Sequence, residues 1–446
     1  MKEKDLLALI NEKLGVESLN EMQRLMLDKS KKNKNIILLS PTGSGKTLAF
    51  ILPVINTLKK DAGRVQCVVI APSRELVMQI AKVARQITPG FRVVELYGGH
   101  KVEDEVNALK VTPDIIISTP GRLLDHSVRH NTELLQVSTL VLDEFDKSLE
   151  LGFEEEMKKI LGRMKNVSRF ILTSATKADI LPEFLKMENP VTIDFTQNNT
   201  SLKERITLHE VRATEKDKLA DLANLLRNIA TISEGKLEKI IVFANHRESA
   251  ERIYQYLKKH SVDCVLYHGA LEQRERETAV ALFNNGSRPI LIATDLAARG
   301  LDIEKVASVI HYHQPLTEQA FIHRNGRTAR IEEEGDVYLL VGPDEEIKDF
   351  IKTDKPFLLD PNIKHPLKSN SETLYINDGK KEKLSKGDIL GFLTKEAGLP
   401  AADIGRIDIF DHYSLVNIQK NEVAKVLQAA STGKIKGKKR KISLLK

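Results

Sequence analysis

One short stretch of the chain combines the residue types that handle phosphate groups. It contains glycines, a lysine and a threonine between an apolar run and a helical segment, in the letters SPTGSGKT. Glycine lets backbone N–H groups converge on phosphate oxygens at a helix N-terminus, lysine reaches the outer phosphates, and the hydroxyl binds Mg²⁺. The stretch predicts a nucleotide-phosphate site made of Ser40, Pro41, Thr42, Gly43, Ser44, Gly45, Lys46 and Thr47.

A second stretch, DEFD, places three carboxylates directly after the apolar run TLVL. Alone, such a cluster is often a solvated turn. In a chain with a phosphate site, we interpret Asp143 as the acid that holds Mg²⁺ and Glu144 as the base that orients and deprotonates the attacking water. Asp146 is then predicted to accept hydrogen bonds from the hydroxyls of Ser174 and Thr176 in the stretch TSAT.

Short β-branched runs alternate with helical segments, which is typical of parallel sheets with crossover helices. The pattern occurs twice, from NIILLS to VTIDF and from ITLHEVRA to DVYLLV. The polar clusters follow the strands, at the edge where open parallel sheets bind ligands. A polar linker at 196–205 separates the two sets. We therefore predict α/β domains at 1–196 and 206–360, and a smaller unit at 372–446.

Composition restricts the class of protein. The chain has 446 residues, of which 41% are hydrophobic and 29% charged, which predicts several soluble cores and no stretch apolar enough to span a bilayer. The N-terminus reads as a charged amphipathic helix rather than a secretory signal, so we expect a cytoplasmic location. Cys67 and Cys264 lie far apart in apolar runs and favour neither a disulfide framework nor a zinc site.

The net charge of +6 lies entirely in the last 76 residues. Residues 371–446 hold 15 Lys and Arg against 9 Asp and Glu, which leaves 53 of each sign before them. The end of the chain, KIKGKKRKISLLK, has seven basic residues and no acidic one. Clustered cations bind phosphate chains by releasing counterions, so we expect a polyanion at Lys438, Lys439 and Arg440. A solvated tail is the alternative.

These stretches resemble the ordered motifs of the DEAD-box RNA helicases. SPTGSGKT, PSREL, GG, TPGR, DEFD and SAT match the first half of that family, and IVF, ATDLAARGLDI and HRNGRTAR match the second half. The resemblance covers about residues 10–360. It implies two RecA-like domains with ATP and RNA bound across the cleft between them, and ATP and Mg²⁺ as cofactors.

The resemblance also implies roles for individual residues. Gln23 would read adenine, Asp302 would reach the ribose, and Arg327 and Arg330 would be arginine fingers on the γ-phosphate. The residues that tie the cleft to the carboxylates and the SAT segment would be His323 and Arg324. Contacts to the RNA backbone would come from Arg74, Gly98, Gly99, Thr119, Arg122, Thr294 and Gly300.

Three positions depart from the pattern of the family. Phe145 stands where the family has alanine, Ala329 replaces a glycine between the fingers, and Leu6 replaces an aromatic residue that precedes Gln23. An aromatic ring at position 145 must pack against a neighbouring strand or project toward the face between the domains. We expect the packed arrangement.

The last unit reads as β-α-β-β-α-β, a ferredoxin-like order. It is similar to the RRM-like domain of bacterial DEAD-box proteins that act on large-subunit ribosomal RNA. SLVNI occupies the strand that usually carries stacking aromatics, so we expect RNA on the Lys and Arg of loops and of the final strand.

The whole sequence predicts a monomeric ATP-dependent helicase for structured or ribosomal RNA, involved in ribosome assembly and without a membrane partner. Two alternatives remain open at this point. One is an ATP-gated RNA clamp with weak turnover, which Phe145 suggests, and the other is a DNA translocase.

Overall fold

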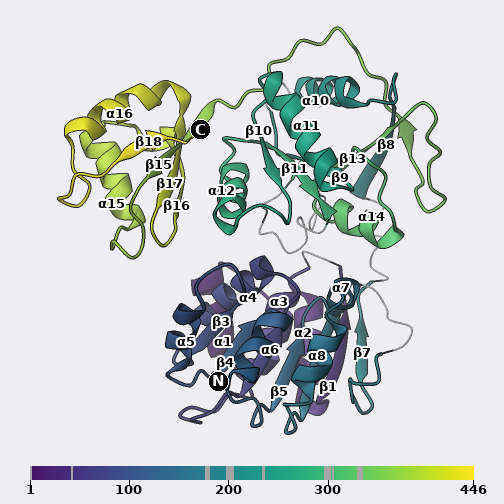
Figure 1. Ribbon diagram of the computed structural model, residues 1–446, viewed down its shortest axis with the longest axis vertical. Helices are drawn as coiled ribbons and strands as arrows, with labels where there is room; N and C mark the ends of the chain where they lie inside the picture. Colours follow the sequence, from purple (N-terminus) through teal and green to yellow (C-terminus); the bar gives the residue numbers. More distant parts are fainter. Residues whose placement is uncertain are drawn as a thin grey trace. The chain divides into compact units, whose positions relative to one another are not determined.

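The computed structural model describes residues 3–41, 44–175, 181–196, 205–233, 237–295, 303, 306–328 and 335–445. Internal contacts divide the chain into two compact units, one with residues 1–204 and one with most of 205–446 (Figure 1). Seven positions discussed above lie outside the described residues: Thr42, Gly43, Thr176, Gly300, Asp302, Ala329 and Arg330.

In its described part, the first unit contains a parallel sheet with the strand order β3-β4-β2-β5-β6-β1-β7. Its strands are β1 (Asn35–Leu39), β2 (Cys67–Ile70), β3 (Val93–Leu96), β4 (Ile115–Ser118), β5 (Thr139–Leu142), β6 (Arg169–Ser174) and β7 (Val191–Asp194). Its helices are α1 (Glu3–Leu14), α2 (Glu21–Lys32), α3 (Lys46–Ile55), α4 (Arg74–Ile87), α5 (Val102–Leu109), α6 (Pro120–Val128), α7 (Phe145–Glu150) and α8 (Glu154–Leu161).

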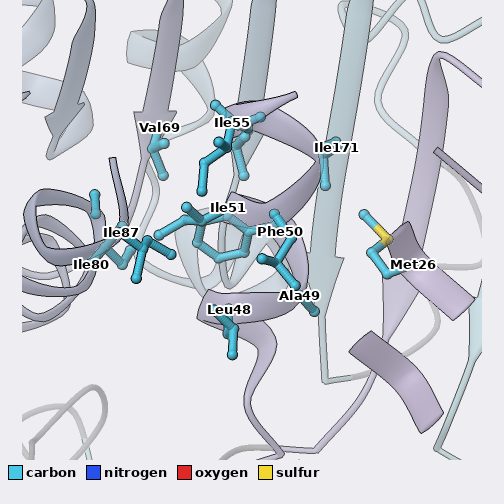
Figure 2. Close-up of a cluster of buried hydrophobic side chains, with 14 of the residues drawn as sticks. Met26, Leu48, Ala49, Phe50, Ile51, Ile55, Val69, Ile80, Ile87 and Ile171 are labelled. Carbon is cyan, nitrogen blue, oxygen red and sulfur yellow. The ribbon is translucent and has the colours of Figure 1, made fainter. Parts of the chain in front are cut away.

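Helices cover both faces of this sheet, so its strands are apolar at successive positions, as expected for buried parallel strands. Val69 of β2 belongs to a core cluster with Phe50 of α3 and residues of α2 and α4 (Figure 2). Its neighbours Val68 and Ile70 belong to a second cluster, with Met157 of α8 and residues of α6. The two clusters hold the strands in place and leave their carboxyl ends to the site residues.

The second unit begins with another parallel sheet, whose described strands have the order β10-β11-β9-β12-β13-β8-β14. Its strands are β8 (Ile206–Arg212), β9 (Ile240–Ala244), β10 (Cys264–Tyr267), β11 (Ile290–Thr294), β12 (Ser308–His311), β13 (Gly335–Val341) and β14 (Lys355–Pro356). Its helices are α10 (Leu219–Ile232), α11 (Arg247–Lys259), α12 (Gln273–Asn284) and α14 (Glu318–Asn325). Two parallel α/β sheets are what the sequence predicted.

The C-terminal domain is an antiparallel sheet with the order β16-β17-β15-β18 and helices between its strands. Its elements are β15 (Ser371–Ile376), α15 (Lys386–Gly391) continued by a π-helical turn (Phe392–Glu396), β16 (Ile404–Ile409), β17 (Ser414–Gln419), α16 (Val423–Thr432) and β18 (Ile442–Leu444). The predicted β-α-β-β-α-β order is confirmed. The final strand is shorter than expected, because the basic segment 434–441 precedes it as a turn and not as a strand.

In the part of the chain that the structure describes, no helix combines the length and the apolar character needed to cross a membrane. Both cysteines are buried free thiols. Burial raises the pKa of the Cys264 thiol to about 12 and that of Cys67 above the ordinary range, so both behave as small core residues.

Phe145 begins α7, and its side chain is only 1% exposed. It belongs to the core cluster of the first unit that also contains Leu142, Leu172 and Met157. The ring therefore packs within its own unit, and the expected packed arrangement is confirmed.

Phe145→Ala should lower the free energy of unfolding by about 3–5 kcal/mol, because a large buried ring leaves a cavity that its neighbours fill only in part. It should not raise the ATPase rate. Urea unfolding followed by circular dichroism measures the loss. Phe153→Ala, at a half-buried position beside the same cluster, should lose clearly less. An unchanged midpoint for the Phe145 variant would contradict the assignment.

Candidate functional site

The sheet order of the first unit brings the predicted site residues to one edge. In a parallel sheet all carboxyl ends lie together, and polar residues follow each of six neighbouring strands. Predicted RNA contacts follow the first three strands in the order, β3, β4 and β2, at Gly98 and Gly99, Thr119, and Arg74. The next three strands are β5, β6 and β1. Asp143 and Glu144 follow β5, the predicted coupling residue Ser174 ends β6, and the predicted nucleotide residues Ser40 to Thr47 follow β1.

The phosphate-binding loop is held from both ends. At its start, the N–H of Ser40 donates to the carbonyl of Ser174 at 3.0 Å, which continues the pairing of β1 with β6. The Ser40 hydroxyl donates to Ser44 Oγ at 2.6 Å. At its end, Gly45 has φ of +88° before α3, and the buried Lys46 Nζ donates to the Ser40 carbonyl at 2.9 Å. The lysine side chain therefore reaches back to the first residue of the loop.

Helix α2 supports the same loop through a capping box. Asn20 Oδ1 accepts from the N–H of Gln23 at 2.9 Å, and Gln23 Oε1 accepts from the N–H of Asn20 at 3.0 Å. Their amide nitrogens donate to the carbonyls of Ser44 and Gly45, at 3.0 and 3.3 Å. Sequence analysis missed Asn20, although Asn-x-x-Gln before an amphipathic helix is a recognisable cap. The adenine-reading role of Gln23 stays a prediction, and Leu6 is buried in the core.

The acidic pair is buried at the end of β5. Asp143 is 2% and Glu144 9% exposed. Burial and the adjacent Glu144 raise the pKa of Asp143 to about 6, against the opposing charge of Lys46. Two adjacent buried carboxylates repel each other, and a divalent cation relieves that repulsion. This donor set therefore fits Mg²⁺, which proteins commonly bind through one or two carboxylates and phosphate oxygens.

Asp146 contacts the TSAT segment through the backbone of Ala175, while its predicted hydrogen bonds from the hydroxyls of Ser174 and Thr176 stay a prediction. Its Oδ2 accepts from the N–H of Ala175 at 3.3 Å, and its Oδ1 accepts from the N–H of Lys147 at 3.0 Å. Glu144, which precedes α7, has a φ of +46°, an uncommon value for a residue with a side chain. The turn after β5 is thus fixed on both sides.

The residues predicted to touch RNA sit at tight backbone positions. Arg74 is the first residue of α4, and Thr119 is the residue just before α6. A Cβ atom at Gly98 would lie 3.2 Å from Arg74 Nη2, so glycine makes room for the guanidinium group. Gly99 has φ of +102°, which other residues rarely adopt. The neighbouring Arg74 side chain thus explains Gly98, and the backbone conformation explains Gly99.

Glu105 of α5 contacts several residues on the side of the sheet edge where the predicted RNA contacts lie. Its Oε2 accepts from Arg122 Nε at 2.6 Å and contacts His126 Nε2 at 2.7 Å, while its Oε1 accepts from the N–H of Tyr97 at 2.8 Å. Burial opposes ionisation, but hydrogen bonds from His100, His126 and Tyr97 and the charge of Arg122 lower the pKa of Glu105 to about 2. Sequence analysis missed Glu105, because the acidic start of α5 looks like a solvated helix end.

In the second unit, Arg324 is 1% exposed and bonded within its own domain. It forms a two-pronged ion pair with Asp295, from Nε to Oδ1 at 2.5 Å and from Nη2 to Oδ2 at 2.7 Å. It also donates to Asn245 Oδ1 at 2.6 Å. The coupling role of Arg324 stays a prediction, and its described contacts hold the ends of β9 and β11 together. Among the described residues of this domain, the other predicted site residues are Thr294, His323 and Arg327, and all three are buried.

The sheet of the C-terminal domain carries an aromatic pair, contrary to expectation. Tyr375 of β15 stacks on Tyr413, with ring centroids 5.6 Å apart. Tyr413 lies one residue before the stretch SLVNI, which is why the sequence reading overlooked it. The guanidinium of Arg274, from α12, lies 5.1 Å from the Tyr413 centroid and donates to the Tyr375 hydroxyl at 2.9 Å. A helix of the second unit therefore covers the aromatic pair.

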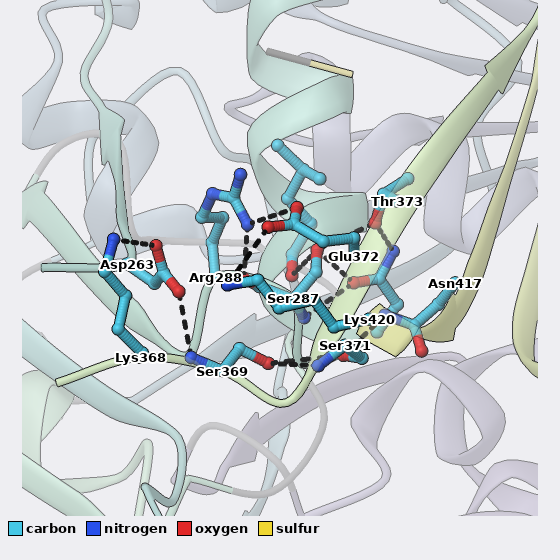
Figure 3. Close-up of polar contacts among 12 residues, drawn as sticks. Asp263, Ser287, Arg288, Lys368, Ser369, Ser371, Glu372, Thr373, Asn417 and Lys420 are labelled. Atoms are coloured by element: carbon cyan, nitrogen blue, oxygen red, sulfur yellow. Dashed lines mark hydrogen bonds and ion pairs between the residues drawn. The ribbon is translucent and has the colours of Figure 1, made fainter. Parts of the chain in front are cut away.

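Polar contacts extend this attachment (Figure 3). Arg288 pairs with Glu372 at 3.2 Å, and both side chains are 13% exposed. Thr373 Oγ1 lies 2.7 Å from Ser287 Oγ and accepts from Asn285 Nδ2 at 3.0 Å. Because these contacts are largely buried, they attach the C-terminal domain to the parallel domain before it.

The basic segment differs from expectation at one residue. Arg440 is buried, pairs with Asp378 and donates from Nε to the carbonyl of Ile435 at 3.2 Å. Its side chain shapes the turn and does not face solvent, so a phosphate contact from it is contradicted. Lys438 and Lys439 are exposed, as predicted for RNA-binding residues.

A phosphate-binding loop and buried acidic pair on one parallel sheet, followed by a second parallel domain with buried arginines, define a P-loop ATPase with two RecA-like domains. Family models match the same parts of the chain: "DEAD/DEAH box helicase" over residues 20–183, "Helicase conserved C-terminal domain" over 217–332, and "DbpA RNA binding domain" over 373–444. The chain belongs to the DEAD-box ATP-dependent RNA helicases.

Individual relatives agree with the family models. "ATP-dependent RNA helicase DbpA" of Escherichia coli (strain K12) is 31% identical over 97% of this chain and 96% of its own length. "DEAD-box ATP-dependent RNA helicase 9, mitochondrial" of Arabidopsis thaliana is 34% identical over 74% of this chain, which covers 55% of that protein. The structure of Mss116p bound to ssRNA and AMP-PNP has a TM-score of 0.69 and 26% identity, covering 81% of this chain and 78% of that one.

Glu105→Ala should weaken RNA binding, because Arg122 loses the carboxylate that holds its guanidinium group, while nucleotide affinity stays the same. Breaking a buried ion pair should also lower stability by roughly 3–5 kcal/mol. Fluorescence anisotropy with labelled RNA, and with a fluorescent nucleotide, measures the two affinities. Glu103→Ala, an exposed carboxylate on the same helix, is the control. Equal RNA affinity for both variants would contradict the role of Glu105.

Proposed function

We propose that this protein binds the RNA backbone and ATP on two halves of one sheet edge, and uses ATP binding and hydrolysis to open structured RNA locally. The observation that carries the proposal is the strand order of the first unit. The RNA-contact residues follow β3, β4 and β2, and the nucleotide residues follow β5, β6 and β1. Because β2 and β5 are neighbours, the two halves adjoin at a single strand pair.

The residues of the nucleotide half have distinct tasks. The loop N–H groups and Lys46 bind the phosphates, and Glu144 orients and deprotonates the attacking water. Asp143 and Thr47 would hold Mg²⁺, which neutralises charge on the phosphates during transfer. Arg327 and Arg330 would supply positive charge from the second domain, and Gln23 and Asp302 would contact the nucleoside.

The C-terminal domain supports ribosomal RNA as the target. The domain model that matches residues 373–444 carries the name of the relative that matches along nearly all of this chain. In this chain, α12 covers the aromatic pair of the C-terminal sheet. Lys438 and Lys439, by contrast, are exposed in the most basic part of the chain. We therefore propose that these lysines hold structured RNA, that the protein acts in ribosome assembly in the cytoplasm, and that it works as a monomer.

The RNA-clamp alternative rested on Phe145 disturbing closure. Because the Phe145 ring is buried in the core of the first unit, it no longer supports the hypothesis of weak turnover. The DNA translocase has no observation in its favour.

The test of the function is ATP hydrolysis with matched nucleic acids. A ribosomal RNA hairpin should stimulate hydrolysis, and a DNA hairpin of the same sequence should not. Glu144→Gln should keep nucleotide binding and slow RNA-stimulated hydrolysis by at least ~10²-fold, the scale of one general base. Lys46→Ala should lose productive ATP use, because the outer phosphates lose their cation. Equal stimulation by DNA, or wild-type turnover in Glu144→Gln, would refute the assignment.

The basic segment should show the signature of phosphate binding. Changing Lys438 and Lys439 to Gln should lower RNA affinity and make the slope of log K against log salt shallower by roughly 0.7–0.9 for each lost contact. ATPase at saturating RNA should stay near wild type. Changing Lys158 and Lys159 to Gln, an exposed pair on α8, removes equal charge elsewhere and should leave the slope unchanged. A wild-type slope in the first variant would support the solvated tail instead.

A further inference from the structure

Thr173 is a fully buried residue of β6 whose hydroxyl faces the acidic pair. The ladder between β5 and β6 pairs Leu142 with Leu172, so the next residues on the two strands, Asp143 and Thr173, lie opposite each other. The Thr173 hydroxyl donates to Asp143 Oδ1, and its oxygen accepts from the N–H of Glu144 at 3.2 Å. One hydroxyl thus contacts both acidic residues.

The position does not require a hydroxyl for packing. Valine has nearly the same shape and suits a buried parallel strand, whereas a buried hydroxyl must find hydrogen-bond partners. Thr173 finds them in the carboxylate of Asp143 and in the backbone of Glu144. The second bond anchors the residue that has the unusual φ of +46°. We therefore infer that the hydroxyl serves to orient the acidic pair rather than to fill space.

We propose that Thr173 is a positioning residue for the hydrolysis site. Its donated hydrogen bond occupies one oxygen of Asp143 and so fixes the rotation of that carboxylate. Its accepted hydrogen bond fixes the backbone from which the Glu144 side chain projects. The inference rests on the proposed function, because the groups that Thr173 aligns are those assigned to Mg²⁺ and to the attacking water.

The experiment compares Thr173→Val, which replaces the hydroxyl with a methyl group, with Thr173→Ser, which keeps the hydroxyl. Thr173→Val should lower kcat at saturating ATP and RNA by roughly 10- to 100-fold, the scale of one hydrogen bond to a charged group. It should also raise the Mg²⁺ concentration that half-saturates binding of a fluorescent ADP. Its melting temperature should fall modestly, because the Asp143 carboxylate and the Glu144 N–H each lose a buried partner. Thr173→Ser should restore most of kcat and of the Mg²⁺ dependence.

Thr139→Val is the matched control. Thr139 is a 2% exposed threonine at the opposite end of β5, paired with Arg169, so its substitution should change neither kcat nor the Mg²⁺ dependence. Wild-type kcat and wild-type Mg²⁺ dependence in Thr173→Val would overturn the proposal. If Thr173→Val does not fold, the comparison uses Thr173→Ser and Thr173→Ala, which differ only in the hydroxyl. Equal kcat and equal Mg²⁺ dependence in these two variants would also overturn the proposal.

The outcome is separable from that of the proposed function. If the wild-type protein shows no RNA-stimulated hydrolysis, the function itself is wrong. The effect of Mg²⁺ on ADP binding still tests Thr173 in that case, because it needs no turnover.

Discussion

The parallel pairing of the strands in the first sheet is the constraint on which the site depends. Hydrogen bonds between neighbouring strands fix their register, and the register decides which residue leaves the sheet first. Leu142 pairs with Leu172 and Leu39 with Ser174, so the acidic pair, the TSAT segment and the phosphate loop leave the sheet side by side. A slip of one residue would turn each of these side chains to the opposite face. The apolar clusters on both faces prevent that slip.

Burial gives this edge its chemistry and also its main energetic difficulty. Asp143 and Glu144 are adjacent carboxylates in a place with little water, where like charges repel strongly. The charge of Lys46 and the hydrogen bond that Thr173 donates to Asp143 partly offset this repulsion, and the proposed Mg²⁺ would supply the remaining positive charge. Glu105 repeats the arrangement on the proposed RNA half, where one buried carboxylate is surrounded by an arginine and two histidines.

The sequence predicted what short motifs encode and missed what long-range contacts decide. The strand runs, the phosphate loop and the acidic pair are local patterns, so the sheets and the residues at their ends could be predicted. Glu105, Thr173 and Arg274 look like ordinary members of a helix start, a strand and a charged helix. Their importance comes from partners 17, 30 and 101 residues away, and no local pattern indicates such partners. The prediction of a phosphate contact from Arg440 was wrong for the same reason, because this side chain is buried and paired with the distant Asp378.

The attachment of the C-terminal domain bears on where its RNA can bind. An RRM-like sheet normally offers aromatic rings to unpaired bases. Here a guanidinium group already lies over both rings, and Ala281 of α12 packs with Tyr413 and Leu415. A base could stack there only after α12 had left, and the largely buried Arg288–Glu372 pair opposes that separation. We propose that RNA binding then falls to the exposed lysines of the basic segment, which would favour recognition of phosphates and of RNA shape over stacking of single bases.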